Sequence, residues 1–123
     1  MPIDYDERQF TSVSNSATGD VGAATVFHYR QRGTIVWGTY GGGAVAQGTL
    51  IARVLADGSL DMRYQHVTAD GRIKAGRCAS RPEILVDGRI RLHERWQWTE
   101  GGAESGESIV EEVPAVPERS DGA

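Results

Sequence analysis

Residues 57–73 read DGSLDMRYQHVTADGRI, and residues 87–99 read DGRIRLHERWQWT. In both stretches an Asp-Gly pair precedes a run in which apolar and polar residues alternate. Asp-Gly between alternating runs is a strong hairpin signal, because a tight primed turn needs positive φ, which Gly and Asp tolerate best. The pairs beginning at Asp57, Asp70 and Asp87 therefore predict three turns with an antiparallel strand on either side of each.

Glycine makes up 16 of the 123 residues, against a usual share of roughly 7%. The segments between the glycines are rich in Val, Ile, Thr, Trp and Tyr and alternate with period two, which favours strands over helices. Pro82 is expected to bend the chain out of the sixth strand. The eight predicted strands are Phe10–Ser14, Thr25–Arg30, Thr34–Tyr40, Gln47–Leu55, Leu60–Thr68, Ile73–Ser80, Ile90–Thr99 and Glu107–Val113.

Eight consecutive antiparallel strands leave two exposed edges, which are removed when the last strand pairs with the first. We therefore expect an all-β fold, an eight-stranded antiparallel up-and-down meander barrel, with an open β-sandwich as the alternative. Residues 1–9 are expected to lead into the barrel and residues 10–113 to form its single domain. Residues 114–123 contain two prolines with charged and small residues, which predicts a disordered acidic tail.

Composition argues against several classes of function. Cys78 is the only cysteine, so no disulfide forms within the chain. The sequence contains no run of about 18 apolar residues, so we expect no membrane partner. Residues 8–99 hold twelve basic and seven acidic residues, too dispersed for a nucleic-acid surface. His28, His66 and His93 lie on separate predicted strands, which argues against a metal site. We expect a soluble, cytoplasmic protein without a cofactor.

Alternation predicts which side chains face inward. In the seventh strand Ile90, Leu92, Glu94, Trp96 and Trp98 share a face, and in the fifth Leu60, Met62, Tyr64 and His66 do so. The third strand is ambiguous, although Trp37 is the stronger candidate for burial. In the sixth strand the pattern leaves open whether Arg77 or Cys78 faces inward.

A barrel of eight strands can hold one small ligand. Aromatic walls with a few polar groups are typical of such sites, so we expect a pocket that binds a small organic ligand. Its predicted lining is Trp37, Tyr64, His66, Glu94, Trp96 and Trp98.

Two other interpretations stay open at this point. In an enzyme, Glu94 or His66 would act as a general base. In a filled structural barrel without a ligand, Glu94 would pair with Arg77, while Tyr64 and His66 would satisfy each other or the backbone. In each case a buried Glu94 needs a partner, because an unpaired buried charge costs several kcal/mol.

The sequence also resembles a family of short bacterial proteins, often named N-acetylglutamate synthase, with an avidin-like or calycin-like barrel. The stretches that carry the resemblance are FTSVSN (10–15), FHY (27–29), GTLI (48–51), LDMRYQH (60–66), PEIL (82–85), DGRIRLHE (87–94) and WQW (96–98). The resemblance implies a barrel of about residues 8–113 and assembly into a homo-oligomer.

The two names associated with this resemblance imply different chemistry. An acetyl-CoA-dependent acyltransferase needs a pyrophosphate site at a helix N-terminus, and the sequence predicts neither the helix nor the loop. The avidin likeness implies a pocket similar to that for biotin, with Asn15 flanked by Ser14 and Ser16 at the first hairpin. No residue-by-residue match carries individual biotin contacts over to this chain.

Overall fold

Eight strands make up the chain in the computed structural model, which describes residues 3–114. All eight predicted strands are present, with ends shifted by a few residues. They are β1 (Arg8–Asn15), β2 (Val26–Arg32), β3 (Ile35–Gly42), β4 (Val45–Val54), β5 (Leu60–Thr68), β6 (Ile73–Ile84), β7 (Ile90–Glu100) and β8 (Ser105–Glu112). The predicted disordered tail lies, from residue 115 onward, outside the described residues.

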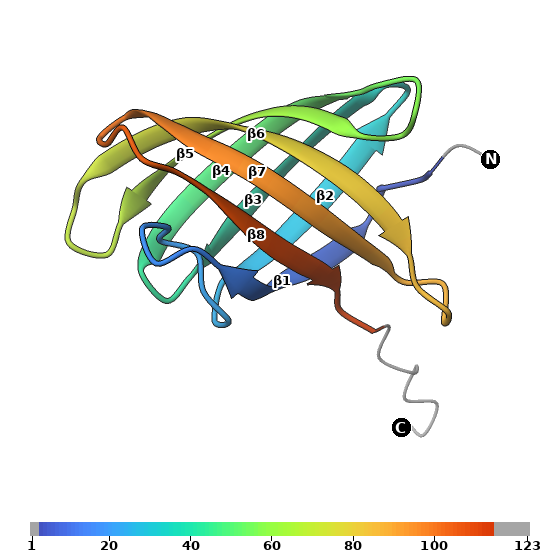
Figure 1. Ribbon diagram of the computed structural model, residues 1–123, viewed down its shortest axis with the longest axis horizontal. Coiled ribbons are helices and arrows are strands. Elements are labelled where there is room, and N and C mark those ends of the chain that lie inside the picture. Colours follow the sequence, from blue (N-terminus) through green and yellow to red (C-terminus); the bar gives the residue numbers. More distant parts are fainter. Residues whose placement is uncertain (1–2, 115–123) are drawn as a thin grey trace.

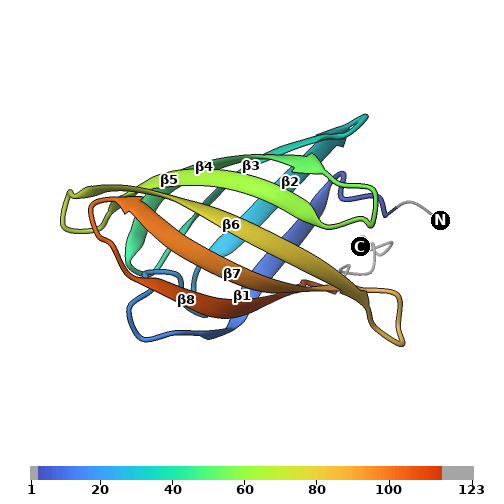
Figure 2. The same cartoon turned by 45° about the horizontal axis from the view of Figure 1, so that its top comes forward.

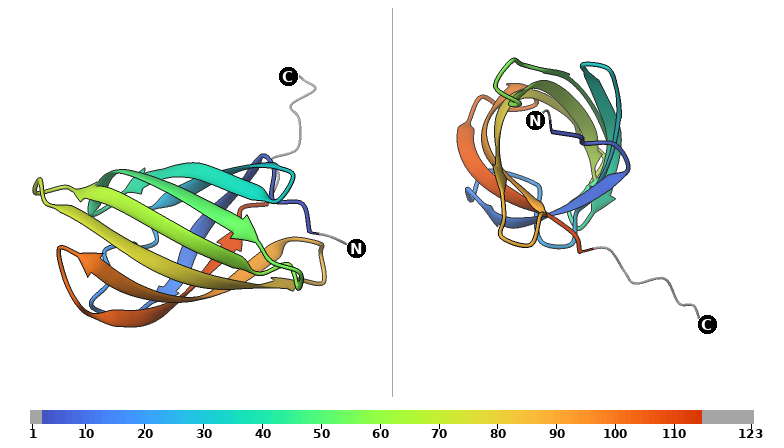
Figure 3. Two further views of the ribbon diagram at one scale, coloured as in Figure 1. Left: turned by 90° about the horizontal axis from the view of Figure 1, so that it is seen from above. Right: turned by 90° about the vertical axis from the view of Figure 1, so that its right-hand side faces the viewer.

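The strands form one closed barrel in which each pairs with its sequence neighbours and β1 pairs with β8 (Figure 1). Viewed along its axis, the sheet forms a complete ring (Figure 3, right). The predicted up-and-down barrel is confirmed, and the alternative open sandwich does not form. No helix in residues 3–114 is long and apolar enough to cross a membrane.

The three Asp-Gly turns share one geometry, which differs from the predicted primed turn. Gly58 donates its N–H to the Leu55 carbonyl, and Leu55 donates to the Ser59 carbonyl. Only the glycine has positive φ, 87° at Gly58. The aspartate accepts a hydrogen bond from the backbone N–H of Ser59 instead of adopting positive φ. These are longer hairpin loops that end in a left-handed glycine.

Pro82 does not end β6, contrary to the prediction. The strand continues to Ile84, and Pro82 pairs with Leu92 of β7. Pairing between β5 and β6 stops at Ser80, so Pro82 lies where β6 has β7 as its only partner. A proline is tolerated there because one side of the strand needs no hydrogen-bond donor.

The first described residues close one end of the barrel. Tyr5 is fully buried and donates its hydroxyl to the Gly58 carbonyl in the β4–β5 turn, 2.7 Å away. Its ring lies near those of Tyr29 and, beyond it, Phe10. Figure 2 shows the N-terminal segment at the end that carries the β4–β5 turn. A ligand site is therefore left to the opposite end, where β1 connects to β2.

The left-handed glycines provide a test of the turn geometry. Gly88→Ala introduces a Cβ into open space but at φ of 90°, whereas Gly22→Ala meets open space at ordinary φ. We expect Gly88→Ala to be less stable than Gly22→Ala by roughly 1–2 kcal/mol, because L-residues disfavour left-handed backbone. Urea unfolding of the two variants measures the difference. Equal stabilities would contradict the turn geometry.

Candidate functional site

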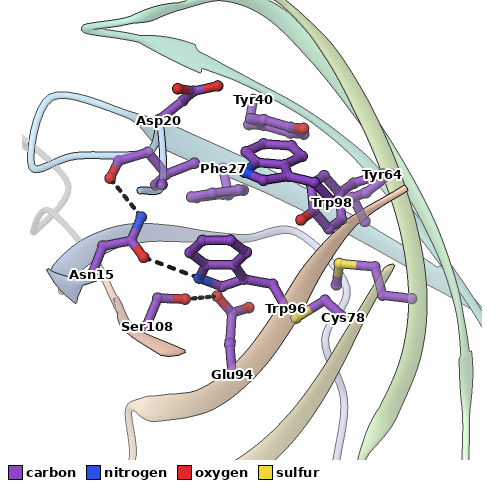
Figure 4. Close-up of a pocket in the computed structure, with 14 residues that line it drawn as sticks. Asn15, Asp20, Phe27, Tyr40, Tyr64, Cys78, Glu94, Trp96, Trp98 and Ser108 are labelled. Atoms are coloured by element: carbon purple, nitrogen blue, oxygen red, sulfur yellow. Dashed lines mark hydrogen bonds between the residues drawn. The ribbon is translucent and has the colours of Figure 1, made fainter. Parts of the chain in front are cut away.

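A cavity of about 50 Å³ lies inside the barrel beneath the β1–β2 loop, residues 16–25 (Figure 4). Its wall is mostly aromatic and aliphatic, with a few polar groups. The lining residues are Asn15, Gly19, Asp20, Val21, Phe27, Tyr40, Leu50, Met62, Tyr64, Cys78, Glu94, Trp96, Trp98 and Ser108. Pockets for drug-sized ligands are several-fold larger, about 300–1,000 Å³. In this closed form the cavity fits only a small molecule unless the loop moves.

Glycines on neighbouring strands make room for the aromatic wall. Tyr40 is paired with Gly48, and a Cβ on that glycine would lie 2.4 Å from the Tyr40 ring. A Cβ on Gly76 of β6 would likewise collide with the Tyr64 ring, and a Cβ on Gly106 of β8 would collide with the Trp96 ring. The cross-strand pairs are Tyr40–Gly48, Tyr64–Gly76 and Trp96–Gly106. Each large ring thus lies across a neighbouring strand that carries no side chain there.

The carboxyl group of Glu94 lies among apolar groups, and within residues 3–114 it forms no ion pair with a cationic side chain. It accepts hydrogen bonds from the hydroxyls of Ser108 at 2.9 Å and Ser80 at 3.2 Å. Burial raises the pKa of Glu94 to about 7, although both serine hydrogen bonds oppose this. A carboxylate has about four acceptor sites, so two serine donors leave acceptor capacity free on Glu94, which lines the cavity.

Three side chains of the sheet hold the β1–β2 loop over the cavity through uncharged hydrogen bonds. Asn15 accepts from the indole Nε1 of Trp96 at 3.0 Å and donates to the Val21 carbonyl at 2.9 Å. The indole of Trp98 donates to the Thr18 carbonyl at 3.4 Å. The two indoles therefore contribute both to the cavity wall and to the position of its cover.

A charged network holds the same loop on the other side. His66 Nε2 and Lys74 Nζ each lie 3.0 Å from Oδ2 of Asp20, and Tyr40 Oη lies 2.9 Å from His66 Nδ1. Burial by itself would raise the pKa of Asp20, but the hydrogen bonds from His66 and Lys74 and the positive charge of Lys74 lower it. Asp20 is therefore ionised at neutral pH.

The ionised state of Asp20 also determines which nitrogen of His66 donates. Because this carboxylate can only accept, Nε2 of His66 donates to it. In the neutral imidazole, Nδ1 then accepts from Tyr40.

The structure brings together five of the six predicted site residues. Tyr64, Glu94, Trp96 and Trp98 line the cavity, and His66 packs behind Trp98, with ring centroids 5.4 Å apart. The alternation that predicted their inward orientation is confirmed.

The predicted inward orientation of Trp37 is wrong. Val36, Gly38 and Tyr40 are the buried residues of β3, whereas Trp37 is 37% exposed on the outer face. The Tyr40 face turns inward because its ring occupies the space above Gly48. Outside, Trp37 pairs across strands with Ile51, and the Arg32 guanidinium lies 5.9 Å from its ring.

The expected homo-oligomer stays a prediction.

The sixth strand, left open by the sequence, turns Cys78 inward and Arg77 outward. Arg77 donates to Gln97, so it does not pair with Glu94 as the filled-barrel interpretation expected. Burial, with the nearby charge of Glu94, raises the pKa of the Cys78 thiol well above its usual value, which disfavours a nucleophilic thiolate. Among residues 3–114, no three His, Cys, Asp or Glu side chains are placed to hold a metal ion.

The residue pattern predicts neither Asp20 nor Lys74 as a site residue, and only the avidin likeness connects Asn15 with a pocket. Lys74 shares the inward face of β6 with Gly76 and Cys78, so fixing the orientation of that strand would have revealed a buried lysine. Asp20 lies in a loop without periodicity, and no pattern in the sequence indicates its contact with His66.

Comparison with known proteins agrees with this architecture. The family model described as avidin-like protein matches residues 3–113, which include all eight strands. The chain matches no curated protein. The match lends no support to the N-acetylglutamate synthase name.

The raised pKa of Glu94 predicts a pH dependence of stability. The folded protein retains the Glu94 proton up to about pH 7, whereas the unfolded chain releases it near pH 4.5. Unfolding therefore becomes easier as pH rises through this window, and we expect the wild type to lose roughly 2–3 kcal/mol between pH 5 and 8. Glu94→Gln should lose much less, because the amide does not titrate. Urea unfolding at both pH values measures this.

The matched control is Glu100→Gln, which changes an exposed glutamate at the end of the same strand. This variant should keep the wild-type dependence. If Glu94→Gln also keeps it, Glu94 does not have the assigned pKa.

Proposed function

The chain belongs to the avidin-like family, and we propose on this premise that it binds one small organic ligand in the cavity beneath the β1–β2 loop. The observation that carries the proposal is the position of Glu94. A buried carboxyl group that accepts hydrogen bonds from two serine hydroxyls and faces an aromatic hollow is suited to a ligand with a hydrogen-bond donor.

The surrounding residues suit the rest of such a ligand. Trp96 and Trp98 lie with ring centroids 5.7 Å apart and present two indoles to the cavity, next to Phe27 and Tyr40. Aromatic faces provide a large contact area with little loss of side-chain freedom. An apolar or planar body against the indoles, with an N–H or O–H directed at Glu94, uses both features.

This interpretation accounts for the arrangement better than the enzymatic one. Catalysis by a general base requires a group that can reach a substrate proton, and His66 already uses both ring nitrogens on Tyr40 and Asp20. The hydrogen-bond partners of the Glu94 carboxyl group in the described part of the chain are two serine hydroxyls, and neither is a second acid or base. Binding needs only an aromatic contact surface and a hydrogen-bond acceptor, which the cavity wall and Glu94 provide.

Tryptophan fluorescence, with native mass spectrometry to identify bound molecules, tests the proposal against a metabolite collection. A ligand should change the emission of wild type and Trp37→Phe alike, because Trp37 lies outside the barrel. At pH 8, where Glu94 is ionised, Glu94→Gln should weaken binding roughly 10- to 100-fold, the value of a hydrogen bond to a charged group. A ligand whose signal disappears in Trp37→Phe, or whose affinity is unchanged in Glu94→Gln, would contradict this site.

A further inference from the structure

Lys74 is a lysine held inside the barrel. It is 6% exposed, and its ammonium lies 4.0 Å from the ring centroid of Trp98. Lysine is almost never fully buried unless it is paired, because removing the ammonium from water is costly. The ion pair recorded for Lys74 among residues 3–114 is with Asp20.

The two sides of this ion pair differ in how firmly they are held. Lys74 and His66 lie directly opposite each other on the paired strands β6 and β5, and His66 is fixed further by Tyr40. Asp20 lies in the β1–β2 loop, outside any strand. Two donors on the sheet therefore converge on one oxygen of a carboxylate carried by a connecting loop.

This anion position adjoins the cavity. Asp20 and Trp98 both line the cavity, and Trp98 also packs against His66 and Lys74. Figure 4 shows Asp20 at the edge of the aromatic group. A molecule that packs against Trp98 thus reaches Lys74 when its charged group takes the position of the Asp20 carboxylate.

We propose that Lys74 and His66 form a carboxylate-binding site, which Asp20 occupies when the cavity is empty, and that the ligand is an organic acid whose carboxylate replaces Asp20. The exchange keeps a counterion beside the buried ammonium in both states. It also removes the charged contacts that hold one side of the loop, so that movement of this side can enlarge a cavity that is otherwise too small for most ligands. This inference rests on the proposed function and specifies the class of its ligand.

The first experiment removes the internal carboxylate with Asp20→Gly and adds sodium acetate, with sodium chloride at equal ionic strength as the reference. Acetate should raise the melting temperature of Asp20→Gly in a saturable manner, with little effect on wild type. The double variant Asp20→Gly/Lys74→Met should not respond. Equal responses to acetate and chloride, or a response that survives Lys74→Met, would overturn the carboxylate site.

The second experiment uses a variant that preserves the shape of the loop. Asp20→Asn replaces the carboxylate by a neutral amide, which competes less well for the ammonium. Phenylacetate should therefore bind Asp20→Asn at least tenfold more tightly than wild type, and phenylacetamide should show no such gain, by isothermal titration calorimetry. No gain for phenylacetate would overturn the displacement of Asp20 by an organic acid.

The outcomes separate this inference from the proposed function. If acetate stabilises Asp20→Gly through Lys74 but phenylacetate shows no gain on Asp20→Asn, the anion site stands and the organic-acid ligand is wrong. Failure of both experiments leaves the cavity open to uncharged ligands, which the fluorescence measurements detect independently.

Discussion

The pairing of β1 with β8 is the constraint on which the rest of the structure depends. It places Ser108 next to Asn15, at the point where the β1–β2 loop begins. Ser108 is also opposite Glu94 on β7 and donates its hydroxyl to the buried carboxyl group, so the closing strand β8 connects the start of the loop with the Glu94 site. The same closure brings Asn15 within hydrogen-bonding distance of Trp96. In an open sheet, Asn15 would lose its contact with Trp96 and the loop would lose an anchor.

The interior is shaped by the pairing of large rings with glycines. Tyr40, Tyr64 and Trp96 each face a glycine on the next strand, so three rings lie across the sheet instead of filling the centre. The opposite end of the barrel is packed with the rings of Tyr5, Tyr29 and Phe10. The molecule therefore has one packed end and one end with a covered, mostly aromatic cavity that contains a few polar groups.

Much of the fold could be predicted from local signals. The Asp-Gly pairs and the period-two alternation located all eight strands, and the inward faces of β5 and β7 followed from residues such as Leu92 and Trp96. Alternation failed where both faces carry large or small residues, as in β3, where the glycine opposite Tyr40 decided the orientation that buried Tyr40 and exposed Trp37. Glycine was interpreted only as a turn residue, so its role beneath the rings was missed.

The polar part of the site could not be predicted, because it depends on contacts between residues far apart in the chain. Asp20 and His66 meet across 46 positions, and neither has a local pattern that indicates the other.

The central claim, that a ligand binds inside the barrel, is tested most directly by NMR. The measurement follows the indole N–H signals of Trp37, Trp96 and Trp98 in ¹H–¹⁵N spectra during ligand titration. We predict that the signals of Trp96 and Trp98 shift together while that of Trp37 stays constant; a shift confined to Trp37 would contradict a binding site inside the barrel.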